Sequence, residues 1–201
     1  MKPTGAYHHG DLQRALKTET VRLLATTEAD AISLREVARN VGVDHRAAYR
    51  HFADRENLIA DVAEDGYRAL SVQLEAGLAK SGARSIDRLL QFARSYVQFS
   101  VKEPGYYRAM IRPRLVDKNR PADAGDAALA ILEREVRAGI SSGVLADDDV
   151  TELAVGLWSH LHGLASLIAG RRLYVKPSIA VAYTNRIFER SLRGLQKRAL
   201  M

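Results

Sequence analysis

The feature that most constrains this chain is a succession of helix start and stop signals from end to end, with no convincing alternation of apolar and polar residues. Ser33 and Glu36 are spaced as a capping box, in which a hydroxyl and a carboxylate satisfy free amides at a helix start. Gly42 suits a helix end, because glycine tolerates a positive φ, and Pro177 suits a first helical turn. These signals predict an all-α fold of about nine helices.

The predicted helices form two domains, for which 201 residues leave enough room. We expect an N-terminal helix-turn-helix domain of three helices over residues 1–53 and a C-terminal helical bundle domain over residues 54–201. A long fourth helix, capped by Asp54, connects them. The expected helices span about 11–26, 34–40, 45–52, 55–79, 85–102, 106–111, 126–142, 150–170 and 177–197.

The composition favours a cytoplasmic protein with some tendency to bind a polyanion. The net charge of +6 is a modest indication of nucleic-acid binding, since many basic proteins bind none. The chain has no cysteine, which excludes disulfides and every thiolate-ligated metal site. The most apolar stretch, residues 153–169, is short and contains two serines and two histidines, so we expect no membrane span. The N-terminus lacks an apolar export segment, and we expect the protein to stay in the cytoplasm.

Motifs for catalysis, metals and cofactors are missing from the sequence. It contains no HExxH, no GxSxG and no glycine loop that could cradle a phosphate. His160 and His162 are two residues apart and would point away from each other on a helix. His8 and His9 are adjacent in an N-terminal arm, where they are either inert or, with Lys2, close to a phosphate backbone. We therefore predict a protein that is not an enzyme and uses neither a metal nor a cofactor.

The residues around Gly42 have the pattern of two short helices that cross at a tight turn. Ala38 lies four residues earlier, where a small side chain allows the helices to approach closely. A small apolar core behind the turn can come from Val37, Val41, Val43, Ala48 and Phe52. The helix after the turn would then expose polar and aromatic side chains, as a DNA recognition helix does. The alternatives are an ordinary helical corner and, for Tyr49, a packed aromatic side chain.

Four segments of the N-terminal region carry a more specific pattern. They are Tyr7–Leu12, Ser33–Ala38, Val41–Val43 and Tyr49–Leu58. Together they resemble the DNA-binding domain of the TetR family of regulators, closely over residues 7–60 and through the helix count over the rest of the chain. Trp158, His162 and Gly163 are similar to the Trp-His-Gly signature of one C-terminal subclass of that family.

The resemblance implies a homodimer that binds successive major grooves of a pseudo-palindromic operator in double-stranded DNA. A small-molecule effector in the C-terminal domain would move the long connecting helix and change the spacing of the two heads, that is, of the two DNA-binding domains of the dimer. Positions that commonly reach bases are matched by Arg35, His45 and Arg46, and positions that commonly hold phosphates by Tyr49, His51 and Arg55. Asp44 and Arg50 complete the predicted DNA-binding set.

Two departures from the family pattern affect what the resemblance implies. The glycine usual after the first helix is replaced by the stretch Thr27–Asp30, so that turn is expected to differ. Asp44 stands where serine or threonine is frequent, and although it still caps a helix, its charge repels a nearby phosphate. The neighbouring pair His45 and Arg46 is also unusual, so the operator sequence does not follow from relatives.

The predicted eighth helix is apolar around nearly its whole circumference, which requires burial on more than one side. One side can face its own bundle, and a partner subunit is the natural cover for the other. We therefore predict a homodimer through about residues 150–170 and 177–197. The alternative is a central core helix in a monomer.

The candidate effector pocket is a set of aromatic and polar side chains in the C-terminal half. It consists of Tyr96, Phe99, Tyr106, Met110, Trp158 and His162. Such residues at helical spacing equally suit an ordinary core, and His162 equally suits a core histidine bonded to a neighbouring helix. The basic stretch 102–120 is either attractive to an acidic effector or a solvated loop.

These observations predict a ligand-responsive DNA-binding transcriptional regulator, with repression as the family default. An architectural DNA-binding protein would need a broad basic surface, against which the acidic stretch 123–152 argues. The sequence also leaves open the alternative of a regulator that has no effector pocket.

Overall fold

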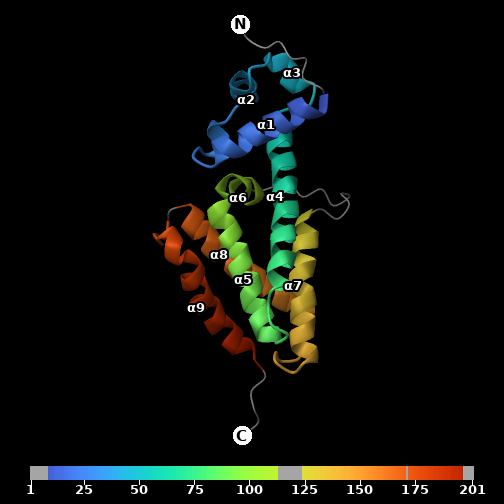
Figure 1. Ribbon diagram of the computed structural model, residues 1–201, viewed down its shortest axis with the longest axis vertical. Helices are drawn as coiled ribbons and strands as arrows, with labels where there is room; N and C mark the ends of the chain where they lie inside the picture. Colours follow the sequence, from blue (N-terminus) through green and yellow to red (C-terminus); the bar gives the residue numbers. More distant parts are fainter. Residues whose placement is uncertain (1–8, 113–123, 171, 197–201) are drawn as a thin grey trace. The chain divides into compact units, whose positions relative to one another are not determined.

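The computed structural model of the protein describes residues 9–112, 124–170 and 172–196. Over these residues it has nine α-helices, one 3-10 helix and no strand, which confirms the all-α prediction (Figure 1). The elements are α1 (His9–Leu24), η1 (Ala29–Ala31), α2 (Leu34–Val41), α3 (His45–Tyr49), α4 (Arg55–Leu78), α5 (Ser85–Lys102), α6 (Pro104–Met110), α7 (Ala124–Ser141), α8 (Val150–Ala169) and α9 (Pro177–Leu195).

Three details differ from the expected helices. α3 ends at Tyr49 rather than near Phe52, because two successive amides bond one carbonyl, that of Ala48, and tighten the last turn. α6 begins at Pro104, which we expected to lie in the break after α5; a proline is tolerated there because the first turn needs no intrahelical donor. The 3-10 helix η1 was not expected, and it occupies the stretch in which the usual glycine is replaced.

Contacts divide the chain into two compact units, which are described separately. Unit 1 comprises residues 1–66 and 104–116, and unit 2 comprises residues 67–103 and 117–201. Unit 1 thus contains α1, α2, α3, α6 and the first half of α4. The predicted division after residue 53 separates DNA binding from ligand sensing and dimerisation, and it stays a prediction. The side chains of Lys2, His8 and His9, and residues 113–120 of the basic stretch, lie outside the described residues.

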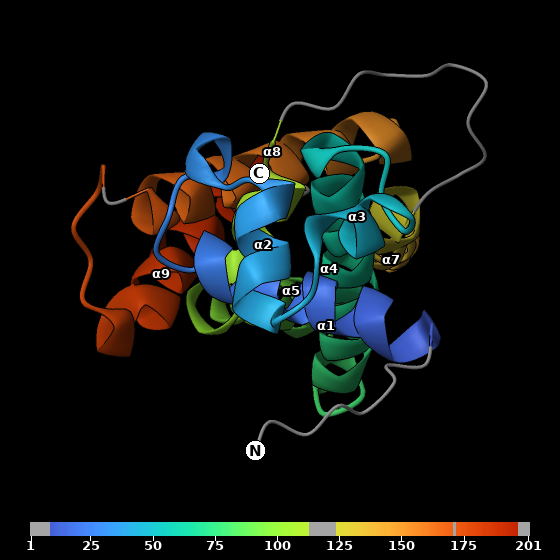
Figure 2. The same cartoon turned by 90° about the horizontal axis from the view of Figure 1, so that it is seen from above.

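The core of unit 1 comes from the apolar faces of its helices. Leu16 and Leu24 of α1, Val37 of α2 and Ala48 of α3 are fully buried. α2 and α3 lie side by side and α1 contacts both (Figure 2). This packing holds the two short helices at a defined angle, although neither is long enough to be stable alone.

The contact between α6 and α1 within unit 1 is very close. Arg108 of α6 donates a hydrogen bond of 3.0 Å to the carbonyl oxygen of Leu24, at the end of α1. A β-carbon at Gly105 would overlap the carbonyl oxygen of Val21, which belongs to the backbone and cannot rotate away. Glycine is therefore required at this position by the approach of the two helices.

Gly105→Ala is expected to destabilise unit 1 by about 1–3 kcal/mol, because the added methyl group must push α6 away from α1. Thermal unfolding followed by circular dichroism measures this effect. The control is Gly82→Ala between α4 and α5, where a β-carbon would meet only Oδ2 of Asp87, at an ordinary contact distance of 3.8 Å. That change should leave stability unchanged or raise it by up to about 1 kcal/mol. Equal unfolding midpoints for the two variants would contradict the close contact.

Unit 2 is a bundle in which α5 contacts α7, α8 and α9 (Figure 1). Its largest fully buried side chains include Phe92 and Tyr96 of α5 and Phe188 of α9. Leu132 of α7 and Leu161 of α8 are also fully buried. The buried faces of these helices are therefore the ones that meet.

A network of charged side chains crosses the bundle of unit 2. Glu135 of α7 is 2% exposed and accepts two hydrogen bonds from Arg88 of α5, at 2.6 and 2.8 Å. Arg134 donates to Glu135 and also pairs with both carboxylate oxygens of Glu75 in α4, at 2.8 and 3.0 Å. Burial alone would raise the pKa of Glu135, but the hydrogen bonds from the two arginines outweigh it and the pKa is lowered.

Candidate nucleic-acid interface and the core of unit 2

The turn between α2 and α3 has the geometry that the sequence predicts. Ser33 is the N-cap of α2, and its hydroxyl accepts a hydrogen bond of 3.1 Å from the amide of Glu36. Gly42 ends α2 with a φ of +83°, in the left-handed region that favours glycine. The helix end at Gly42 and the hydroxyl half of the predicted capping box are confirmed, and they set where α3 begins relative to α2.

The predicted recognition helix, α3, is anchored at its start and exposed over its polar face. The carboxylate of Asp44 accepts a hydrogen bond of 2.8 Å from the amide of Arg46, which caps the helix as predicted. Tyr49 is 45% exposed, and its ring meets that of His45 edge to face at 6.3 Å. The alternative of a packed core role for Tyr49 is therefore wrong. The exposed residues of the predicted DNA-binding set are Arg35, Asp44, His45, Arg46, Tyr49 and Arg50, and His51 is half-buried.

The start of α4 is fixed by Asp54 and surrounded by charge. Asp54 accepts hydrogen bonds from the amide and the side chain of Asn57, at 2.8 and 2.9 Å, which lower its pKa. Arg55, expected to hold a phosphate, is instead bonded within unit 1 to Glu56 and to the carbonyl oxygen of Asp30. Arg112 contacts the same two acidic residues. Sequence reasoning missed this cluster, because nothing local indicates that residues 30, 56 and 112 meet.

Four of the six predicted effector-pocket residues lie in unit 2. The hydroxyl of Tyr96 is 2.8 Å from Nδ1 of His162, and the ring of Trp158 meets that of Tyr96 edge to face at 5.1 Å. Burial lowers the pKa of His162. Phe99 is also buried, and Phe92, which was not predicted, lies beside Trp158 with ring centres 6.3 Å apart.

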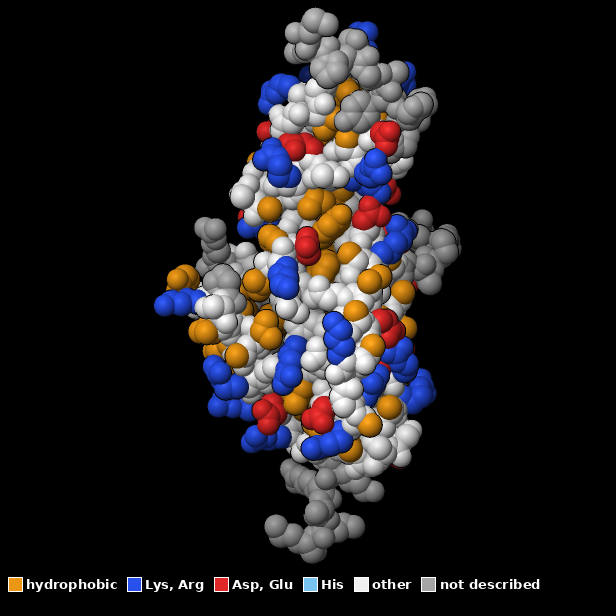
Figure 3. All heavy atoms as spheres, viewed as in Figure 1, with side chains coloured by type: hydrophobic (Ala, Val, Ile, Leu, Met, Phe, Trp, Pro, Cys, Tyr) orange, Lys and Arg blue, Asp and Glu red, His pale blue; other side chains and the backbone are white. Residues whose placement is uncertain are grey.

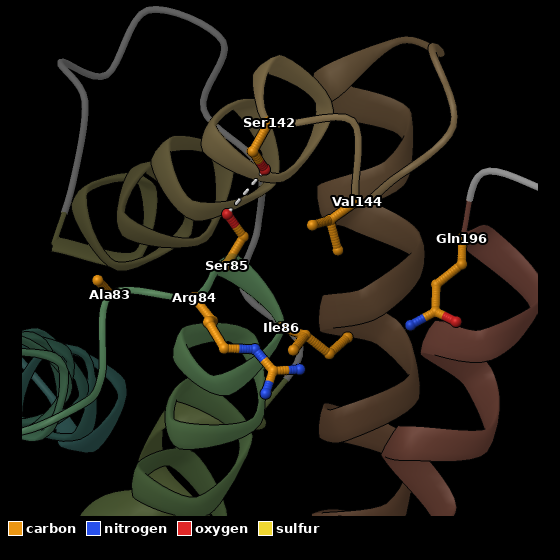
Figure 4. A pocket seen from close by; sticks show the side chains of 7 residues that line it. All are labelled: Ala83, Arg84, Ser85, Ile86, Ser142, Val144 and Gln196. Carbon is orange, nitrogen blue, oxygen red and sulfur yellow. Dashed lines mark hydrogen bonds between the residues drawn. The ribbon is translucent and has the colours of Figure 1, made fainter.

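The remaining two predicted residues, Tyr106 and Met110, lie in unit 1, where a β-carbon added to Gly66 would meet them. The six residues are therefore divided between the two units, because α6 belongs to the first. A pocket of about 500 Å³ does lie in unit 2, at the start of α5 (Figure 4). It is lined by Ala83, Arg84, Ser85, Ile86, Ser142, Val144 and Gln196, and includes none of the six. Ser85 and Ser142 are hydrogen-bonded beside it at 3.0 Å.

One face of α8 is exposed although α8 is among the most apolar helices. Its inner side buries Leu157, Leu161 and Leu164. Its exposed residues include Val155, Gly156, Ser159, His160, Gly163 and Leu167, which fall on one side of a helix of 3.6 residues per turn. We call these six residues the small-residue face. It has small residues at positions 156, 159 and 163 and apolar ones at its ends, and the ring of His160 meets that of Phe188 in α9. Another helix could approach the small residues closely.

The distribution of charge, of potential metal ligands and of apolar helices bears on what else the described surface could bind. On the face shown in Figure 3, lysine and arginine side chains are interspersed with aspartate and glutamate rather than forming one basic field. No group of three or more potential metal ligands occurs among the described residues. None of the described helices is both long and apolar enough to cross a membrane.

Comparisons with protein families match both parts of the chain. The model described as bacterial regulatory proteins, tetR family, matches residues 18–62. The model described as tetracyclin repressor-like, C-terminal domain, matches residues 89–195. The uncharacterised HTH-type transcriptional regulator YobS of Bacillus subtilis (strain 168) is 25% identical over 140 residues, which are 70% of each chain.

Solved structures similar to this chain cover nearly all of it. A protein of unknown function from Rhodococcus sp. RHA1 is 28% identical, with a TM-score of 0.73 and coverage of 98% of this chain and 100% of that one. A TetR-family transcriptional regulator from Pectobacterium atrosepticum is 21% identical, with a TM-score of 0.72 and coverage of 96% and 97%. PfmR of Thermus thermophilus, also described as a TetR-family regulator, is 21% identical, with a TM-score of 0.69 and coverage of 92% and 97%. The last two likenesses show a shared fold.

Proposed function

The chain belongs to the TetR family of bacterial transcriptional regulators, and from this premise we propose that it binds a specific pseudo-palindromic operator as a homodimer. The family consists of DNA-binding regulators and not of enzymes. We propose further that a small molecule bound to unit 2 modulates this binding and that the regulator represses its genes. Its place of action is then the cytoplasm, where the operator DNA lies.

The observation that carries the proposal is the exposed polar face of the capped helix α3. Arg46 is an exposed cation in the first turn of α3, and recognition helices place base-contacting side chains in that turn. Its guanidinium has paired donors that match O6 and N7 of guanine in the major groove. His45 and Tyr49 flank it with further polar groups. We therefore assign Arg46 to base reading.

Arg46→Ala is expected to weaken binding to the preferred operator by about 1–3 kcal/mol and to relax base preference at one position of each half-site. The wild-type protein would first select its operator from a random pool of duplexes. Competition with single-base variants then measures the preference at each position for wild-type protein and variant.

The matched control is Arg39→Ala, which removes an exposed arginine of α2 outside the predicted set. It should keep every base preference, even where it changes affinity, because a contact to phosphate carries no sequence information. If Arg46→Ala keeps the full preference at every position, the reading face is assigned wrongly.

The proposed dimer is supported by the small-residue face of α8 and by apolar groups on α9, where Ile179 is half exposed. Two heads that read successive major grooves must lie about 34–36 Å apart. A two-fold contact through residues 150–170 and 177–197 would cover the exposed apolar groups and supply the second head. An obligate interface of this kind buries on the order of 2,000 Å² or more in total.

The proposed effector site is supported by the hydrogen-bonded pair of Tyr96, which is buried, and His162, which is half-buried. Polar groups among aromatic side chains are typical of small-molecule sites. A ligand there could act on DNA binding only through different affinities for the bound and unbound states, typically by about 1–3 kcal/mol. α4 contributes residues to both units and is therefore the continuous element through which we propose the coupling runs.

A further inference from the structure

Four charged side chains of unit 1 meet at the start of α4. Arg55 and Glu56 open that helix, Asp30 lies in η1, and Arg112 follows the end of α6. Nη1 of Arg112 lies 3.0 Å from Oδ1 of Asp30, and its Nη2 lies 3.3 Å from Oε2 of Glu56. Arg55 contacts the same two carboxylates. We call these four residues the α4 cluster, in which two guanidinium groups share two carboxylates.

Arg55 is the member of the α4 cluster that the family pattern assigns to a DNA phosphate. Its Nη1 donates to the carbonyl oxygen of Asp30 at 2.9 Å, and its Nε donates to Oε1 of Glu56 at 2.9 Å. About a third of the side chain is exposed, 32%, against 23% for Arg112. A phosphate must therefore compete with Glu56 and Asp30 for this guanidinium.

The charge balance of the α4 cluster decides that competition. With Arg112 present, the two carboxylates retain a cationic partner when a phosphate draws Arg55 away. Without Arg112, the two carboxylates would depend on Arg55 alone. They are 82% and 54% exposed, so the cost of releasing Arg55 would be the repulsion between their two negative charges and the polyanion. The adjacent Asp54 adds a third negative charge at the same helix start.

We propose that Arg112 is a positioning residue for DNA binding: it neutralises Glu56 and Asp30 and so leaves Arg55 available to a phosphate. The inference rests on the proposed function. It adds to the residues that support DNA binding one that lies 82 positions after Asp30 in the sequence. Arg112 acts through Arg55 and needs no contact with DNA.

The test measures binding of the full-length protein to a random-sequence duplex of about 30 base pairs. Fluorescence anisotropy is recorded from about 50 to about 200 mM salt, so that the salt slope reports the number of phosphate contacts. Arg112→Ala is expected to weaken binding about three- to tenfold at the low-salt end and to reduce the slope by about one per head. Glu56→Gln added to Arg112→Ala should restore most of the affinity, because it removes the competitor for Arg55.

The control is Arg22→Ala, which removes an arginine from an ion pair with Glu19 elsewhere in unit 1 and should leave the slope unchanged. Circular dichroism checks that each variant is folded. A purely structural role for Arg112 predicts no rescue by Glu56→Gln, and that result overturns the proposal, as does an unchanged slope in Arg112→Ala.

A second variant keeps the test decisive if Arg112→Ala does not fold. Glu56→Gln alone should bind the duplex more tightly than wild-type protein, and equal or weaker binding overturns the proposal. If the wild-type protein binds no duplex at all, that result would instead contradict the proposed function. The two failures are therefore distinguishable.

Discussion

Gly163→Glu is expected to convert the proposed dimer into a folded monomer that no longer binds its operator tightly. Gly163 lies on the small-residue face of α8, and a β-carbon there meets no atom of the chain within 4 Å. The change therefore creates no clash within one chain, and replacing a glycine inside a helix generally favours the helix. In a two-fold contact it would place two carboxylates between closely packed helices, where burying unpaired charge is costly.

Sedimentation at micromolar concentration measures the change in oligomeric state, and operator binding should fall by about 10²–10⁴-fold because the two heads no longer act together. The control is Ala127→Glu at an exposed position of α7, which should remain dimeric. Leu164 is a poorer site for the test, because it is 9% exposed and a charge there would disturb the bundle itself. A dimeric Gly163→Glu protein with full operator affinity would refute the proposed interface.

Glu135→Gln is expected to lower the free energy of unfolding by about 3 kcal/mol, because it leaves the guanidinium groups of Arg88 and Arg134 without their shared carboxylate. The cost falls mainly on Arg88, since Arg134 is half exposed and keeps Glu75. Denaturant unfolding at fixed protein concentration measures it. The control, Glu133→Gln on the same helix, should cost no more than about 0.5 kcal/mol.

The same network gives the stability a defined pH dependence. The pKa of Glu135 is lowered from its ordinary value of 4.5, and that of Glu75 is lowered by the hydrogen bonds from Arg134. A lowered pKa means that the stabilisation is fully present above about pH 4.5 and is lost as the pH falls through the pKa of the folded state. Wild-type protein should lose stability below that pH more steeply than Glu135→Gln. Parallel curves would show that Glu135 is not held ionised by its arginines.

The capped helix starts were predictable because their causes are local. Ser33, Asp44 and Asp54 each accept a hydrogen bond from an amide two or three residues later, and Asp149 does the same for Glu152. A spacing of two or three residues can be read directly from the sequence. The same holds for Gly42, whose positive φ depends only on how α2 ends.

The exposed face of α3 was also predictable, since the apolar residues of the turn take the inner positions and leave the polar ones outside. The partners of the individual side chains could not be predicted from the sequence. Arg112 lies 82 residues from Asp30, Tyr96 lies 66 residues from His162, and these pairs meet only because particular helices pack together.

The sequence by itself therefore determined the helices, their caps and the outward polar face of α3, because each follows from contacts within one or two helical turns. Only the tertiary structure decided that α6 packs in unit 1, so that Tyr106 and Tyr96 belong to different units, and that Arg55 shares its carboxylates with Arg112. A helical pattern specifies which face of a helix is buried, but many neighbours can cover that face. The choice among them depends on close packing, such as the approach of α6 to α1 at Gly105, which no periodicity encodes.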